Sequence, residues 1–182
     1  MSKIYTVVII VGSLRKESVN KQFAQALTKQ LPADFRAEFA RIDDLPLYNQ
    51  DDDDSPAPAV TRLRQTIKAA DGVLLVTPEY NRSISGVLKN ALDHGSRPWG
   101  KSVWAGKPAA VAGVSGGPIG AALAQQHLRN VMAFLGMPTL PGQEMFIQWK
   151  EGLVVDGAIG PASRDFVQSF VDAFAAWVRK FG

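Results

Sequence analysis

The sequence predicts an α/β protein built on one five-stranded parallel sheet with helices on both faces. Short segments rich in β-branched and aliphatic residues alternate with longer segments whose apolar residues recur at helical spacing. The strand-like segments are apolar almost throughout, which is typical of strands buried on both faces of a parallel sheet. The length of 182 residues suits one domain, which we expect to comprise residues 1–182.

The predicted elements alternate regularly along the chain. Strands are expected at residues 5–11, 36–42, 72–76, 108–114 and, for a short last strand, 143–147. Helices are expected at residues 19–31, 60–70, 86–94, 123–135 and 166–181, with a polar loop at 43–58. The last helix has the clearest apolar stripe, formed by Phe166, Phe170, Phe174, Trp177 and Phe181. Five strands in a chain of this length suit the flavodoxin-like order 2-1-3-4-5, in which a ligand binds beyond the carboxyl ends of the strands.

The composition restricts the chemistry. The chain has no cysteine, which excludes disulfides, thiolate metal sites, a cysteine nucleophile and a CxxC redox pair. Any redox reaction would therefore depend on a bound cofactor. No apolar run approaches the roughly 18 residues of a membrane span. The first residues lead directly into a strand without a secretory signal, so we expect a cytoplasmic protein without a membrane partner.

Charge is distributed unevenly. The net charge is +3, but residues 43–54 contain six acids and no base, so the remainder carries 20 basic against 11 acidic residues. This excess suits an anionic ligand. A nucleic-acid partner is not expected, because the sequence shows no basic helix. The run Asp51–Asp54 is interpreted as a solvated loop rather than a metal site, because adjacent acids repel one another and a metal cage needs ligands from several directions.

The loop after the first strand predicts a phosphate site. Gly12 permits a tight turn there. Ser13, Ser18 and Asn20 offer hydroxyl and amide groups at the start of a helix, where free backbone N–H groups and the helix dipole favour an anion. Arg15 adds a positive charge with several donors. The loop lacks the GxGxxG pattern of dinucleotide-binding folds and the GK[ST] ending of a P-loop; the alternative is a simple helix cap by Ser18 beside an exposed Arg15.

Two more loops follow strands that end at the same edge. After the third strand, Tyr80 and Asn81 could pack along a flat ring and hydrogen-bond its edge, although a polar turn with Tyr80 covering the sheet edge explains the composition equally well. After the fourth strand, Ser115-Gly116-Gly117 would let the backbone approach a planar ligand closely. A plain glycine-rich connection has the same composition.

The order of these motifs resembles the NADPH-dependent FMN reductase family. The resemblance covers residues 4–147 and is greatest to the bacterial NAD(P)H:quinone oxidoreductases also described as chromate reductases. The motifs that carry it are Gly12-Ser13-Leu14-Arg15 with Ser18 and Asn20, Pro78-Glu79-Tyr80-Asn81 with Leu88-Lys89-Asn90-Ala91-Leu92-Asp93, Gly106-Lys107-Pro108, and Ser115-Gly116-Gly117.

The resemblance implies a flavin site on the three loops. The residues expected at the FMN phosphate are Ser13, Arg15, Ser18, Val19 and Asn20. Those expected along the isoalloxazine are Pro78, Glu79, Tyr80 and Asn81, with Ser115, Gly116 and Gly117 at its other edge. No catalytic side chain beyond the flavin and no metal ligand is expected. Trp99 and Trp104 could flank the flavin or a partner subunit, or cap the core.

We therefore predict an oxidoreductase with bound FMN that passes electrons from NAD(P)H to quinones or other small acceptors, among them chromate, other metal oxyanions or flavin. Donor and acceptor would share one open flavin face, which predicts ping-pong kinetics. The resemblance also implies a homodimer or homotetramer. The mixed apolar and charged residues at 86–104 and 121–135 predict that the third and fourth helices form its interface. The alternatives are a flavodoxin-like electron carrier, disfavoured by the positive net charge, and a regulatory domain without nicotinamide turnover, disfavoured by the phosphate loop.

Overall fold

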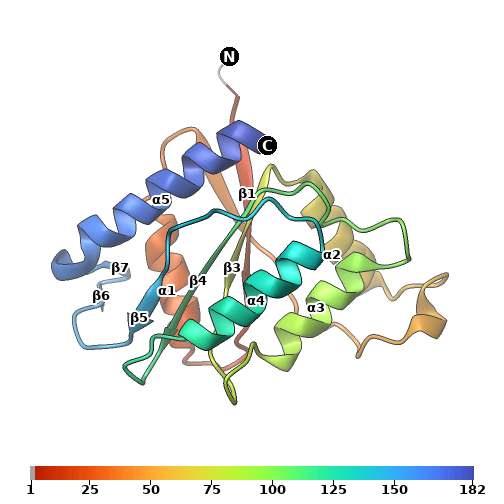
Figure 1. The fold of residues 1–182 in the computed structure, drawn as a ribbon, viewed down its shortest axis with the longest axis horizontal. Coiled ribbons are helices and arrows are strands. Elements are labelled where there is room, and N and C mark those ends of the chain that lie inside the picture. The colour runs from red at the N-terminus through yellow and green to blue at the C-terminus, as the bar shows by residue number, and fades with distance from the viewer. Residues whose placement is uncertain (1–2) are drawn as a thin grey trace.

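The computed structural model describes residues 3–182 and shows a parallel sheet between two layers of helices (Figure 1). The strand order is β2-β1-β3-β4-β5, which confirms the predicted flavodoxin-like topology. The strands are β1 (Tyr5–Val11), β2 (Phe35–Phe39), β3 (Gly72–Val76), β4 (Ala109–Ser115) and β5 (Phe146–Gln148). The helices are α1 (Val19–Thr28), α2 (Pro58–Ala69), α3 (Gly86–Ser96), α4 (Ala122–Phe134) and α5 (Pro161–Phe181).

The central strands separate two hydrophobic clusters. Successive side chains of a strand point to opposite faces of the sheet. In β1, Val7 and Ile9 therefore join the cluster under α1 and α5, whereas Val8 and Ile10 join the one under α2, α3 and α4. All four side chains are fully buried, as the continuous apolar run predicted.

The long helix α5 buries a different stripe from the one expected. Phe170 and Phe174 are buried, but Phe166 and Phe181 are 52% and 42% exposed. The buried face contains Phe170 and Phe174 together with Val167, Val171, Ala175 and Val178, which recur three and four residues apart. The aromatic spacing alone therefore located the helix correctly and its buried face only in part.

The edge strands and one hairpin also differ from expectation. Strand β2 ends at Phe39 and not at residue 42, and β5 begins at Phe146 and not at residue 143. The sequence predicts these bounds poorly because edge strands are half-exposed and their apolar pattern is weak. A small antiparallel hairpin joins β6 (Val154–Val155) to β7 (Ala158–Ile159). Its turn residues Asp156 and Gly157 both have positive φ, 49° and 69°, as a two-residue Asp-Gly hairpin turn requires. No helix within residues 3–182 is long and apolar enough to cross a membrane; the cytoplasmic location stays a prediction.

Candidate cofactor site

The three loops singled out in the sequence meet at one end of the sheet, called here the carboxyl edge, which lies at the bottom of Figure 1. Parallel pairing sets their heights: Val11 at the end of β1 lies opposite Val76 at the end of β3, and Val76 lies opposite Ala112 of β4. The chain therefore leaves β1 and β3 at the same level, and β4 continues past that level to Ser115. This edge is where doubly wound sheets bind their ligands.

Gly12 is required by close packing rather than by a tight turn. Its φ is not positive, which corrects the expectation from the sequence. A Cβ at this position would lie 2.9 Å from the Ser85 hydroxyl oxygen and 3.0 Å from the Leu88 Cβ. The absence of a side chain lets β1 approach the start of α3, and this contact brings the first two loops together.

The loop that follows Gly12 has the features of an anion site. Ser18 is the N-cap of α1, where its hydroxyl oxygen accepts a hydrogen bond from the Lys21 N–H at 3.2 Å, and Ser13 is half-buried beside an exposed Arg15. Within residues 3–182, the backbone N–H groups of residues 13–18 have no acceptor. The first turn of α1 also contains no acid. These donors and the helix dipole are available to a phosphate.

Asn20 is bonded differently from the other residues predicted at the phosphate. Its amide is buried and forms two hydrogen bonds with Val114 of β4, accepting from the N–H and donating to the carbonyl oxygen, both at 3.0 Å. Its hydrogen-bonding groups are thus directed at the sheet. Asn20 holds the start of α1 against the end of β4, next to half-buried Val19. Its contribution to the loop is therefore positional.

The second loop is fixed to α4 by Glu79. Buried Pro78 follows β3, and the Glu79 carboxylate then accepts hydrogen bonds from the Leu123 and Ala124 N–H groups at 3.0 and 3.2 Å. Helix α4 has no side-chain cap of its own, because its N-cap position is Ala121. Glu79 takes over this role from another segment, so its side chain is directed at the helix and only the backbone of this residue remains for a ligand.

Tyr80 and Asn81 remain available at the surface. Tyr80 is 45% exposed. Its backbone pairs with Ser83 on both sides of a tight turn, in which Asn81 and Arg82 have φ of 52° and 66°. The left-handed conformation is tolerable for Asn but costs free energy at Arg82. The Ser83 hydroxyl is 2.8 Å from His127 Nδ1, which gives the loop a second attachment to α4.

The third loop leaves open space beside its backbone. Gly116 and Gly117 are exposed, and no heavy atom lies within 4 Å of the position a Cβ would take at either residue. The Ser115 hydroxyl donates to the Gly117 carbonyl and accepts from the Ala121 N–H, both at 3.2 Å, so that the loop is held in shape from within. A flat ring can therefore approach this backbone without meeting a side chain.

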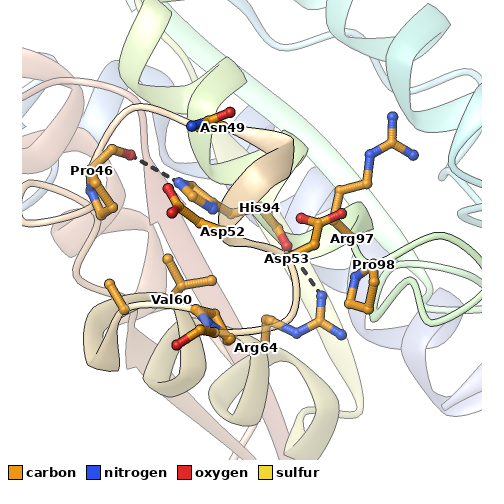
Figure 2. Close-up of a pocket in the computed structure, with 12 residues that line it drawn as sticks. Pro46, Asn49, Asp52, Asp53, Val60, Arg64, His94, Arg97 and Pro98 are labelled. Atoms are coloured by element: carbon orange, nitrogen blue, oxygen red, sulfur yellow. Dashed lines mark hydrogen bonds between the residues drawn. The ribbon is translucent and has the colours of Figure 1, made fainter.

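A separate hollow of about 250 Å³ lies between the loop at residues 46–57, α2 and the end of α3 (Figure 2). None of the predicted cofactor residues lines it. Two of its polar side chains are engaged: His94 Nε2 bonds the Pro46 carbonyl at 2.9 Å, and Arg64 donates to the His94 carbonyl at 3.1 Å. Burial lowers the pKa of Arg64, and the facing Asp53 opposes this effect. Part of the acidic run thus faces a half-buried arginine.

Residues 3–182 contain no His, Asp and Glu cluster suited to a metal.

The two tryptophans have different surroundings. Trp104 is fully buried, and its indole N–H donates to the Leu92 carbonyl at 2.9 Å, so it belongs to the core. Trp99 is 78% exposed beside α3. Of the alternatives left open by the sequence, core packing is correct for Trp104, and Trp99 remains available to a ligand or partner.

Known proteins match this chain over most of its length. Residues 5–151 match the sequence model of the NADPH-dependent FMN reductase family. The chain belongs to this family. It is 52% identical over 176 residues to a 2-hydroxy-1,4-benzoquinone reductase from a Burkholderia species, covering 95% of this chain and 96% of that protein. It is 46% identical to a quinone reductase from Pseudomonas putida, covering 98% and 97%. The structure of FerB, a flavoenzyme NAD(P)H:(acceptor) oxidoreductase from Paracoccus denitrificans, superposes with a TM-score of 0.94 at 42% identity, covering 98% and 100%.

Family membership makes the chain an NAD(P)H-dependent oxidoreductase that uses FMN. The residues present fit such a group. The unpaired N–H groups, hydroxyls and Arg15 at the start of α1 suit a doubly charged phosphate, and the side-chain-free backbone at Gly116 and Gly117 suits a flat ring.

Proposed function

We propose that the protein is an FMN-dependent NAD(P)H:quinone oxidoreductase whose flavin lies along the carboxyl edge. The observation that carries this proposal is the combination of an anion site and an open glycine backbone at one edge of the sheet, after two strands that are separated by β3 alone. The anion site follows β1 and the glycine backbone follows β4, with the loop of Tyr80 and Asn81 between them. A flavin mononucleotide has these two parts, a phosphate at one end and a planar ring at the other.

The proposed roles of the residues follow from their bonding. Ser13, Arg15 and Ser18, with the N–H groups around them, hold the phosphate; Asn20 and Glu79 hold the loops in place through Val114 and α4. The backbone of Pro78 and Glu79, with Tyr80 and Asn81, lines one side of the ring. The backbone of residues 115–117 lines the other.

The bound FMN supplies the redox chemistry by accepting a hydride and releasing electrons to an acceptor. The chain contributes binding, orientation and hydrogen bonds at the ring edge. No side chain among the three loops is required as an acid or base in this proposal, since quinone reduction can take its protons from water.

Quinones are the proposed acceptors. Support comes from the relatives named as quinone reductases, one of them for 2-hydroxy-1,4-benzoquinone. The exposure of Tyr80, Gly116 and Gly117 leaves one ring face open for both donor and acceptor. A shared face requires the nicotinamide to leave before the quinone enters, and this order is the basis of ping-pong kinetics. Chromate or another metal oxyanion would react at the same face as an incidental acceptor.

The proposed assembly is a dimer, or a tetramer built from dimers, formed through α3 and α4. Phe134 is 79% exposed, and together with Trp99 it borders a cleft of about 650 Å³ between the two helices. Large apolar side chains exposed this far favour burial against a second copy. Sedimentation at micromolar concentration should give a species larger than the 19.7 kDa monomer, and Phe134→Asp should shift it to the monomer.

The test of the function is direct. The purified protein is expected to be yellow with one FMN per chain, and to oxidise NAD(P)H rapidly only when a benzoquinone is added. Initial rates at several quinone concentrations should give parallel double-reciprocal lines. Flavin content without NAD(P)H turnover would indicate an electron carrier. Intersecting lines would contradict the shared face, and absence of FMN binding would refute the proposal as a whole.

A further inference from the structure

A cleft of about 480 Å³ lies beside the phosphate loop, between α1 and the end of β2. One wall carries Leu14, Lys16 and Lys21, and the other carries Phe39 and Arg41. Its volume is within the range of about 300–1,000 Å³ that is usual for small-molecule sites. It shares Ser13 and Arg15 with the anion site, so a ligand in the cleft would continue directly from the phosphate.

The flavin ring leaves this cleft unfilled, because the two lie on opposite sides of the phosphate loop. The strand order is β2-β1-β3-β4-β5, and the loops that suit the ring follow β3 and β4. The far wall of the cleft follows β2, three strand spacings from β4, or roughly 14 Å. FMN bound with its ring toward Gly116 therefore ends at the phosphate loop.

The cleft is positively charged. Lys16 and Lys21 are exposed and have no carboxylate within 4.0 Å among residues 3–182. Arg41, by contrast, is bound by Asp43 through two hydrogen bonds of 2.8 and 3.2 Å. The lysines thus leave their charge available to a ligand, while the charge of Arg41 is balanced by Asp43.

The same cleft offers an apolar surface to a ring. Phe39 is 41% exposed at the end of β2, and Leu14 is 50% exposed across from it. An exposed aromatic face beside exposed lysines is suited to a nucleotide, whose base stacks on aromatic rings while its phosphate pairs with cations.

We propose that this cleft binds the adenosine 5′-phosphate part of a dinucleotide, with the adenine against Phe39 and the phosphates at Lys16 and Lys21. The inference rests on the proposed flavin site. Two dinucleotides present this chemistry: NADPH, whose adenosine would extend past the phosphate loop while its nicotinamide lies on the ring, and FAD, whose adenosine would continue from the phosphate of the flavin.

The test uses 2′,5′-ADP, which has the adenosine and phosphates but neither nicotinamide nor flavin. Calorimetric titration of the FMN-loaded protein should show saturable binding. Phe39→Ser should weaken it about fivefold, since base stacking on an aromatic ring is lost. Lys21→Gln should weaken it about threefold, and more at low salt. The matched control is Lys29→Gln, an exposed lysine at the far end of α1 that should leave the affinity unchanged.

Two further measurements distinguish NADPH from FAD as the source of the adenosine. If NADPH is the ligand, the two cleft variants raise KM for NADPH with little change in kcat or in KM for the quinone. If FAD is the ligand, the wild-type apoprotein binds FAD more tightly than FMN, and the variants abolish that difference.

Binding of 2′,5′-ADP that is absent, or equal in wild type and both cleft variants, would overturn the proposal. Two variants are used so that weaker 2′,5′-ADP binding in both is not explained by misfolding of one of them. A failure of the proposed function is distinguishable, because it would show as lost FMN content or quinone reduction in the wild type and would leave the 2′,5′-ADP titration informative.

Discussion

The two ends of the parallel sheet carry similar polar residues but bond them differently. At the end opposite the proposed site, called here the amino edge, the Asp71 carboxylate accepts from the Thr6 N–H at 2.7 Å and pairs with Lys3 at 3.0 Å. At the carboxyl edge, the N–H groups of residues 13–18 have no partner within the described chain, and Arg15 is exposed.

Two other charged groups at the amino edge are also paired. Arg179 donates to Asp34 through two hydrogen bonds of 3.0 and 2.8 Å, and the Lys107 ammonium donates to the Lys68 and Ala70 carbonyls. Buried or half-buried polar groups normally find partners within the protein. The run of consecutive N–H groups without an acceptor at residues 13–18, beside an exposed arginine, therefore favours ligand binding, whereas the paired charges at the amino edge favour stability.

Asn20 is an exception to this difference between the edges, because it lies at the carboxyl edge but both of its amide groups are paired. Asn20→Ala would leave the buried N–H and carbonyl of Val114 without partners, and should lower the free energy of unfolding by about 2–4 kcal/mol. The matched control is Asn90, whose amide makes the same two-way pair with Tyr48 and Pro46 at 2.8 Å but is half-exposed. Water can replace it there, so Asn90→Ala should cost only about 1 kcal/mol. Equal losses of stability in the two variants, measured by denaturant unfolding, would show that burial does not determine the cost of removing the amide.

Arg15→Ala tests the unpaired group most directly. A hydrogen bond to a charged group contributes roughly 1.5–3 kcal/mol, so FMN binding should weaken about 10- to 150-fold. Riboflavin, which has no phosphate, should bind the variant and the wild type equally. The control at the amino edge is Arg36→Ala, which should leave both affinities unchanged because Arg36 lies beside Thr6. Affinities are compared at one ionic strength. Equal loss of riboflavin binding would place the phosphate elsewhere.

The sequence predicts the central strands of the sheet well. Strands β1 and β3 were expected at their observed bounds, because runs such as residues 72–76 are apolar at every position. The hairpin at Val154–Ile159 was missed although its Asp156-Gly157 turn is a strong local signal. Strands of two residues fall below the length at which periodicity can be recognised.

The three loops that the sequence singled out do meet at one edge of the sheet, but the sequence did not predict the bonds within them. Ser18 as N-cap and Arg15 as a free cation follow from residue type and position. The partner of Asn20 lies 94 residues away, and the partners of Glu79 lie 44 and 45 residues away. No local pattern identifies such partners, so residues that hold a loop and residues that contact a ligand are indistinguishable until the fold is known.

Glu79→Ala sharpens the distinction between holding and contacting. Loss of a cap at the start of α4 should reduce stability by about 1–2 kcal/mol and loosen the adjoining loop. FMN and riboflavin should then lose affinity by the same factor, unlike in Arg15→Ala, because the ring side of the site is affected. Glu79→Gln keeps an acceptor and should recover part of both losses. A loss confined to FMN would mean that Glu79 acts on the phosphate, against its observed bonding.

The smallest effect is expected at the amino edge, from Asp71→Asn. Burial alone would raise the pKa of Asp71, but the hydrogen bond from Thr6 and the pairing with Lys3 outweigh it, so the pKa lies below 3.8. A depressed carboxyl pKa stabilises the fold above the unfolded-state value, and this contribution is lost as the pH falls through the folded-state value.

At pH 7, Asp71→Asn should therefore be about 0.5–1 kcal/mol less stable than the wild type, since the amide still accepts from Thr6 while the ion pair is lost. The two proteins should converge as the pH falls through the lowered pKa of Asp71. Urea unfolding between pH 7 and pH 3 measures this difference, and FMN affinity at pH 7 is the control. A changed FMN affinity would mean that the two edges are coupled. A constant gap in stability at all pH values would attribute the loss to packing rather than to the charge of Asp71.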